Sequence, residues 1–106
     1  MDKPIKTYDE FYQFYLKEHQ NPINRMLHVI GTTIVLALTL TAILHFNPYW
    51  LIFVPISGYG FAWIGHFFFE KNQPATFKYP FWSLKSDFKM YFDILNGKVP
   101  LNPQKN

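Results

Sequence analysis

The chain of 106 residues contains no cysteine, which excludes disulfides, thiolate metal ligands and cysteine nucleophiles. It has no glycine-rich phosphate-binding loop, and none of its serines stands in a nucleophile-elbow pattern. These absences leave nucleotide-dependent and serine-hydrolase chemistry without support. The first 25 residues are polar and mixed in charge and lack the features of a signal peptide, so we expect the apolar segments to remain in the mature protein.

The largest absence is of charge, because no Asp, Glu, Lys or Arg occurs between Arg25 and Glu70. This uncharged stretch holds two apolar segments, 26–46 and 49–69, separated by the turn residues Asn47 and Pro48. Each segment has 21 residues and would rise about 31 Å as a helix, enough to cross a hydrocarbon core of about 30 Å. A soluble bundle is the alternative, but its helices would normally keep a charged outer face. We therefore predict a transmembrane helical hairpin.

All ten basic residues lie in the two flanks, where acidic residues are interleaved with them, and the formal net charge is +3. This pattern gives no support for a nucleic-acid partner and favours contact with anionic membrane lipid. Because both flanks are basic and the turn is uncharged, the positive-inside rule predicts that both termini are cytoplasmic. The membrane would be a bacterial inner membrane or the endoplasmic reticulum.

The flanks carry two further helical patterns. Residues 7–19 begin with a capping box, Thr7 and Glu10, and carry a stripe of tyrosine and phenylalanine that we expect to pack at the membrane surface. Asn21-Pro22 should end this helix. Residues 82–96 have the apolar spacing of an interfacial helix. The predicted fold is a single all-α membrane domain, 1–106, with an amphipathic helix at each end on the cytoplasmic side. Two spans bury little surface, so we also expect a homodimer.

The four histidines fall into two groups in this hairpin. His28 lies in the first turn of the first span and His66 in the last turn of the second, so an up-and-down hairpin places them at the same depth. His45 follows His28 by 17 residues, about 25 Å along a helix, and belongs to the opposite interface. His19 precedes the Asn21-Pro22 bend, which can turn it back toward the same end. Ionisable side chains at membrane depth indicate a functional site.

The second span contains a row of small residues, Gly58 and Ala62, that leads to His66, with Gly65 beside it. Such a row lets two helices approach closely, so it should face the first span and direct His66 into the interface. Glu70 follows His66 by one turn. It could be a metal ligand, or it could orient a histidine that binds the metal.

We therefore expect His19, His28, His66 and Glu70 to form a single-metal site. Nitrogen and oxygen ligands suit iron, zinc or manganese. The alternative is that these histidines only cap or bridge a packed hairpin.

Three runs of sequence carry a family resemblance: HQNPINRMLHVIGT at 19–32, FAWIGHFFFEKNQPA at 61–75 and PFWSLKSDFKM at 80–90. Together they resemble the signatures of the small membrane 2-hydroxy fatty acid dioxygenases, whose fungal member acts in sphingoid-base breakdown. The resemblance covers roughly residues 8–92. It implies Fe(II)-dependent oxidation of a 2-hydroxy fatty acid by molecular oxygen to the acid one carbon shorter, with release of carbon dioxide. It also implies essential histidines at His19, His28 and His66.

Other polar residues near the expected site have open roles. Arg25 and Lys71 lie where a fatty-acid carboxylate would be bound at headgroup depth, although they could equally be membrane anchors. Asn24, Asn72 and Asp87 could orient ligands or tie loops together. Two other functions remain as alternatives: a non-catalytic membrane hairpin that binds a partner, and a zinc-dependent membrane lipid hydrolase.

Overall fold

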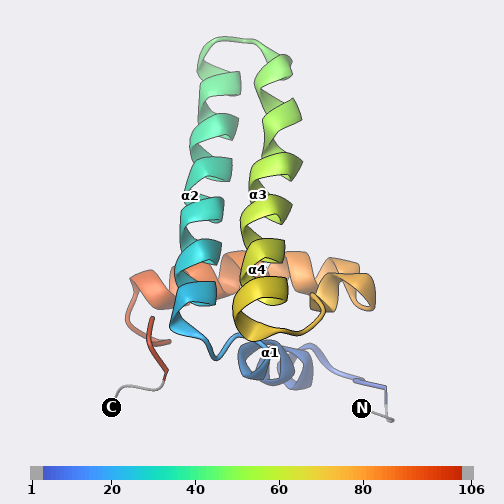
Figure 1. Cartoon of the computed structure of the whole chain (residues 1–106). Coiled ribbons are helices and arrows are strands. Elements are labelled where there is room, and N and C mark those ends of the chain that lie inside the picture. The colour runs from blue at the N-terminus through green and yellow to red at the C-terminus, as the bar shows by residue number, and fades with distance from the viewer. Residues whose placement is uncertain (1–3, 104–106) are drawn as a thin grey trace.

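The computed structural model describes residues 4–103, in which every regular element is helical (Figure 1). The expected single domain also includes residues 1–3 and 104–106, which lie outside the described range. The described residues contain four α-helices and no strand, which confirms the predicted all-α fold. The elements are α1 (Tyr8–Lys17), α2 (Pro22–Leu44), the short η1 (Pro48–Ile52), α3 (Phe53–Ile64), η2 (Gly65–Glu70), η3 (Ala75–Phe77) and α4 (Pro80–Leu95).

Two of these helical segments form the long antiparallel hairpin of Figure 1. One is α2 and the other runs without a break from η1 through α3 to η2; each has 23 residues, and their mean hydropathies are 2.1 and 1.4. Large apolar side chains stay exposed along both, including Leu40 at 56 %, Ile56 at 64 % and Phe68 at 70 %. Soluble proteins rarely expose an apolar surface of this extent. Both segments are therefore long and apolar enough to cross a membrane.

The ends of the first long helix differ from the predicted boundaries. It begins at Pro22 because the Asn21 side chain accepts a hydrogen bond from the Ile23 amide and proline is well suited to the first helical position. Asn21-Pro22 thus starts α2, whereas α1 already ends at Lys17. The second segment starts as a 3₁₀ turn at Pro48, capped in the same way by the Asn47 side chain.

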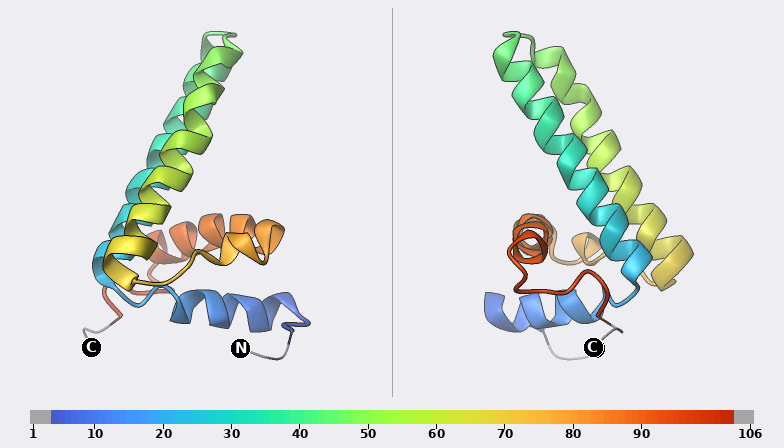
Figure 2. Two further views of the ribbon diagram at one scale, coloured as in Figure 1. Left: turned by 45° about the vertical axis from the view of Figure 1, so that its right-hand side comes forward. Right: turned by 90° about the vertical axis from the view of Figure 1, so that its left-hand side faces the viewer.

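At the base of the hairpin, α1 and α4 lie one below the other and extend to the same side (Figure 2). The aromatic stripe of α1 is buried against α4, so the expectation that it faces the membrane surface is wrong. Tyr12 and Tyr15 are 6 % and 1 % exposed, and their hydroxyls donate to Asp93 at 2.8 Å and to Asp87 at 2.5 Å. Since carboxylates on α4 accept these bonds, the tyrosine hydroxyls do not need water.

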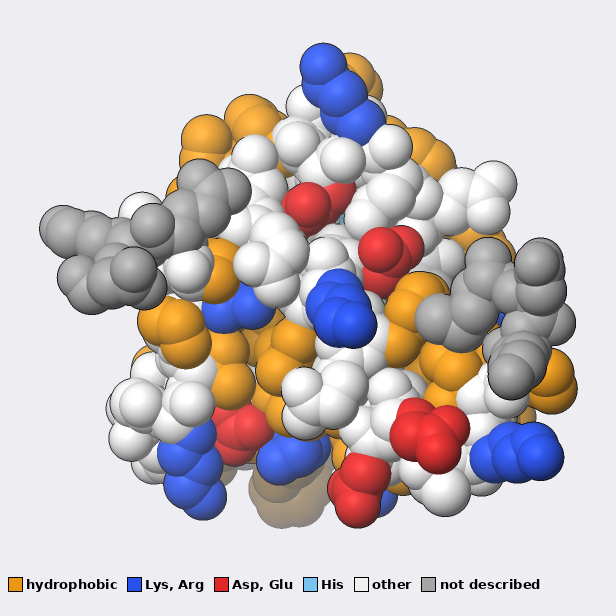
Figure 3. All heavy atoms as spheres, turned by 90° about the horizontal axis from the view of Figure 1, so that it is seen from below, with side chains coloured by type: hydrophobic (Ala, Val, Ile, Leu, Met, Phe, Trp, Pro, Cys, Tyr) orange, Lys and Arg blue, Asp and Glu red, His pale blue; other side chains and the backbone are white. Residues whose placement is uncertain are grey.

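The charged residues gather on this base. Seen from below, the molecule carries Lys, Arg, Asp and Glu side chains spread among hydrophobic and other atoms (Figure 3). The hairpin that rises from this base contains no charged side chain from residue 26 to residue 69. The molecule is thus divided into a polar base and an apolar hairpin, and the boundary between them is where His28 and His66 stand.

Glycines set how closely the two long helices approach. A Cβ at Gly58 would lie 3.4 Å from the Val35 side chain, so this small residue faces α2 as predicted. The approach is tightest at the base, where a Cβ on Gly65 would lie 1.8 Å from the side-chain oxygen of Asn24. The backbone of η2 is therefore packed directly against α2 beside the histidines.

We predict that Gly65→Ala destabilises the protein by about 1–3 kcal/mol, because the added methyl overlaps the fully buried Asn24 side chain. The matched control is Gly60→Ala, since a Cβ there meets nothing within 4 Å. Alanine in place of this exposed helical glycine should raise stability by up to about 1 kcal/mol. Thermal unfolding in detergent, followed by circular dichroism, measures both. Equal effects of the two substitutions would contradict the close approach.

Candidate metal centre

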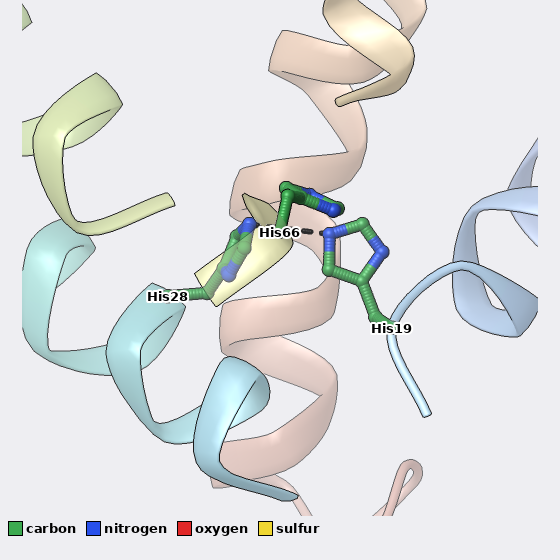
Figure 4. A group of neighbouring side chains, drawn as sticks. All are labelled: His19, His28 and His66. Carbon is green, nitrogen blue, oxygen red and sulfur yellow. Dashed lines mark hydrogen bonds between the residues drawn. The ribbon is translucent and has the colours of Figure 1, made fainter. Parts of the chain in front are cut away.

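Three histidines from three different elements meet at the base of the hairpin (Figure 4). His19 lies in the turn after α1, His28 in the first turns of α2 and His66 in η2. One potential ligand atom from each lies within 4.8 Å of those of the other two, and the exposed fractions are 1 %, 5 % and 2 %. His45 is exposed at the far end of α2 and belongs to no such group within the described residues.

Each imidazole is oriented through its Nδ1 atom. Nδ1 of His19 lies 2.6 Å from the carbonyl oxygen of Tyr15, and Nδ1 of His28 lies 2.9 Å from that of Asn24. Nδ1 of His66 lies 2.7 Å from the side-chain oxygen of Asn72, whose amide nitrogen donates to the Glu18 carbonyl. Carbonyl oxygens only accept hydrogen bonds, so all three Nδ1 atoms carry the proton. The three Nε2 atoms are therefore left with lone pairs.

These lone pairs face one another. Nε2 of His19 and Nε2 of His28 are 3.1 Å apart, and both are acceptors in the tautomers just described. Two acceptors at this distance repel each other unless a positive charge lies between them or beside them. A metal cation bound by the Nε2 atoms would remove the repulsion, and Nδ1 bonded to a protein oxygen is the usual arrangement of a metal-ligating histidine. The residues therefore fit a metal ion.

The electrostatics keep His19 neutral, as a ligand must be. Burial lowers the pKa of His19 well below its ordinary value, and the neighbouring His28 and His66 lower it further. The hydrogen bond to the Tyr15 carbonyl acts in the opposite direction but is the weaker effect. At neutral pH the site therefore offers an unprotonated nitrogen from this residue.

The chain around His66 has an irregular backbone. η2 is π-helical, a form that is rare and is frequently found at functional sites. It ends at Lys71 in the left-handed region, φ 61°, which lets the Asn72 amide donate to the His66 carbonyl at 3.0 Å. This turn brings the Asn72 side chain back onto the His66 ring. The sequence patterns contain no signal for a π-helical turn, so they missed this backbone geometry, although Asn72 is among the residues considered above for orienting ligands or tying loops together.

Glu70 lies outside the three-histidine group. Its Oε1 accepts from the Asn21 amide at 2.5 Å and from the Asn24 side-chain amide at 3.3 Å. A carboxylate at a helix N-terminus satisfies free amides and interacts favourably with the helix dipole. Glu70 therefore ties the end of the second long helix to the start of the first. The Asn24 amide is fully buried in this contact, with its oxygen against Gly65.

The two basic residues near the site are placed differently from each other. Arg25 is 2 % exposed and donates from Nε to the His19 carbonyl and from Nη1 to the Pro100 carbonyl, both at 2.5 Å. Its guanidinium thus fixes the turn that carries His19. Lys71 is exposed at the end of η2.

A small space adjoins the histidines, and residues that the sequence analysis did not assign to the site line it, among them Tyr15, Tyr59, Ala62 and Trp63. The Tyr15 ring stacks on His19 with 4.0 Å between ring centroids, and its hydroxyl donates to Asp87. Burial raises the pKa of Asp87 to about 7, although the Tyr15 hydrogen bond opposes the shift. The space therefore has a carboxyl group that can exchange a proton near neutral pH.

The family model described as 2-hydroxy-palmitic acid dioxygenase Mpo1-like matches residues 5–99. The chain belongs to this family. No curated protein and no solved structure gives a significant match. The matched range includes all three histidines and every α-helix, so the Mpo1-like assignment covers the whole candidate centre. The family description points to a dioxygenase acting on a 2-hydroxy fatty acid, and the centre can hold the metal ion that such chemistry needs.

We predict that Asn72→Ala weakens metal binding by about 10–100-fold, because His66 loses the oxygen that fixes its tautomer and orientation. Titration of the purified protein with Zn²⁺, followed by calorimetry, measures this. Asn72→Asp keeps an acceptor for Nδ1 and should bind more tightly than the alanine variant. Asn96→Ala, at an exposed position after α4, is the matched control and should bind as the unchanged chain does. Unaltered affinity in Asn72→Ala would contradict the assigned role.

We also predict a pH dependence that Asp87 controls. Its pKa is about 7 in the folded protein and near its ordinary value of 3.8 when the chain is unfolded. The folded state therefore holds a proton that the unfolded state releases, so this residue makes stability fall as pH rises from about 4 to about 7. Thermal unfolding over this range, compared between the unchanged chain and Asp87→Asn, isolates the effect, because the histidines contribute equally to both. If the unfolding temperature changed with pH in the same way in both chains, the assigned role of Asp87 would be contradicted.

Proposed function

We propose that this protein is an Fe(II)-dependent dioxygenase that converts a 2-hydroxy fatty acid to the fatty acid one carbon shorter, a step of fatty acid α-oxidation. The observation that carries the proposal is the set of three Nδ1-anchored histidines whose potential ligand atoms lie within 4.8 Å of one another, found in a member of the Mpo1-like family. Three histidine ligands leave positions open on a metal, as oxygen chemistry requires.

The overall reaction balances without a further reductant. A 2-hydroxy acid and one oxygen molecule give the shorter acid, carbon dioxide and water. The bond between the carboxyl carbon and the hydroxyl-bearing carbon breaks, and the substrate loses four electrons. One oxygen molecule accepts four electrons when it is fully reduced. The protein therefore needs no binding site for a nicotinamide or flavin donor, and the chain has no glycine-rich loop for one.

His19, His28 and His66 would hold the metal. When bound, Fe(II) supplies the one-electron chemistry with molecular oxygen that amino-acid side chains do not provide. The protein residues do the rest. The Nδ1 partners fix the ring orientations, burial excludes bulk water, and Asp87 exchanges a proton beside the site at neutral pH. Glu70 acts in this proposal as the positioning residue that holds the start of α2, and with it His28.

The membrane supplies the substrate in this proposal. The hairpin crosses a bacterial inner membrane or the endoplasmic reticulum with both termini cytoplasmic, and the polar base holds the carboxyl end of the fatty acid at headgroup depth. Lys71, which is exposed at the end of η2, would attract the carboxylate. In a sphingolipid-degrading pathway the same reaction would process the 2-hydroxy acids released there. Two copies of the hairpin would pack as a homodimer.

The test uses the purified full chain in detergent, loaded with Fe(II) under nitrogen and then supplied with 2-hydroxypalmitic acid with or without oxygen. We expect the shortened acid and carbon dioxide only with oxygen. His66→Ala should abolish turnover and metal binding, because it removes one of the three ligands. His45→Ala, on the exposed far end of α2, should leave both unchanged.

Two outcomes would favour the other functions. Lipid hydrolysis by the zinc-loaded protein in the absence of oxygen would indicate a metal-dependent hydrolase. A folded protein that binds no metal and turns over no substrate would indicate a non-catalytic hairpin. In that case His28→Gln and His66→Gln variants should keep whatever partner binding the hairpin has.

A further inference from the structure

A second cavity runs up the hairpin from the candidate metal centre. Its volume is about 270 Å³. Side chains from three helices form its walls away from the centre: Thr32 and Val35 on α2, Pro55 and Gly58 on α3, and Leu84 and Phe88 on α4. We refer to this cavity as the hairpin groove. Thr32 is the one polar residue of these six, and the other five are apolar or lack a side chain. The walls therefore offer few hydrogen-bonding groups to a polar ligand.

The hairpin groove adjoins the space beside the histidines. His28, Tyr59, Ala62 and Asp87 line both cavities. One end of the groove is therefore at the candidate metal centre, and Asp87 supplies a carboxyl group at this end. The other end lies among Val35, Val54 and Pro55, where both long helices are uncharged. A molecule that fills both cavities must be polar at one end and apolar along the rest of its length.

The dimensions also fit an elongated ligand. His28 and Val35 are seven residues apart on α2, which corresponds to about 10 Å along the groove at about 1.5 Å per residue. The volume is close to the lower end of ligand-binding pockets, about 300–1,000 Å³. An alkyl chain fills a narrow apolar groove of this length, whereas a ring system or a sugar would not.

We infer that the hairpin groove binds the acyl chain of the substrate, with the methylenes nearest the carboxyl group lying between α2, α3 and α4. This inference rests on the proposed oxidation of a 2-hydroxy fatty acid. Gly58 is the residue that keeps the groove open halfway along its length. Gly58 and Val35 both line the groove, and a Cβ on Gly58 would lie 3.4 Å from the Val35 side chain, so a larger side chain there would take up room between these two walls. Gly58 thus determines how many methylenes the groove accepts.

The first test measures KM for a series of short 2-hydroxy acids that stay dissolved in water. Each methylene that the groove buries should lower KM by about fourfold, and the decrease should stop once the chain extends beyond the groove. In Gly58→Leu the decrease should stop several methylenes earlier, while the shortest acids react as before. Gly58→Ala should give a smaller change in the same direction, and it keeps the test valid if the leucine variant does not fold.

The control is Gly60→Leu, two residues further along α3. Gly60 does not line the groove, and a Cβ there meets nothing within 4 Å. This variant should keep the unchanged dependence on chain length. If Gly58→Leu and Gly60→Leu behave alike, or if KM in the unchanged chain does not depend on chain length, the inference is overturned.

A second test does not need turnover. 2-Hydroxypalmitic acid with a photoreactive diazirine at successive positions is bound under nitrogen and irradiated, and the labelled residues are found by mass spectrometry. We expect the label to move from Tyr59 and Ala62 toward Val54 and Pro55 as the diazirine moves away from the carboxyl group. Label spread over the lipid-facing residues Leu40 and Ile56 would overturn the inference. Ordered labelling without oxygen-dependent product would leave the groove assignment standing and refute the oxidation itself.

Discussion

The hydrogen bonds on the three Nδ1 atoms are the interactions on which the centre depends. Two of them are local, because His19 and His28 each bond a carbonyl four residues earlier in the chain. The third joins His66 to Asn72 across the left-handed turn at Lys71. Each ring is thus oriented by its own segment. The rest of the fold has only to bring three correctly oriented rings together, which is an easier task than orienting them by mutual contact.

Two different kinds of packing bring the rings together. The close approach of Gly65 to Asn24 places His66 beside His28. Glu70 reinforces it by accepting hydrogen bonds from the backbone amide of Asn21, just before α2, and from the side-chain amide of Asn24. The turn that carries His19 is held by the aromatic contact of α1 with α4 and by Arg25. The first contact belongs to the apolar hairpin and the second to the polar base. The centre lies where the two parts join, which gives it access both to an apolar groove and to charged groups.

Much of this arrangement follows from the sequence. The uncharged stretch gave both long helices, and helix length alone separated His45 from His28 and His66. The predicted boundaries of the long helices differ from the observed ones because Asn21 and Asn47 cap the helices that follow them. Asparagine is common both in turns and at helix caps, so the sequence did not distinguish the two roles. The prediction that the tyrosines of α1 face the membrane surface was wrong because their hydrogen-bond partners, Asp87 and Asp93, lie more than 70 residues away in the sequence. The π-helical turn and the bond from Asn72 to His66 depend on local backbone geometry, which periodicity does not encode.

The distribution of the ligands among separate elements has a consequence for biogenesis. His19 is translated before either long helix, His66 is supplied only when the second long helix is complete, and α4, which holds α1 in place, comes last. A nascent or half-inserted chain therefore has no complete coordination set. A metal ion would meet at most two of the three histidines before the second long helix is complete. Because α4 packs on α1 and so helps to fix the turn that carries His19, the three-histidine centre is complete only when α4 has also folded into place.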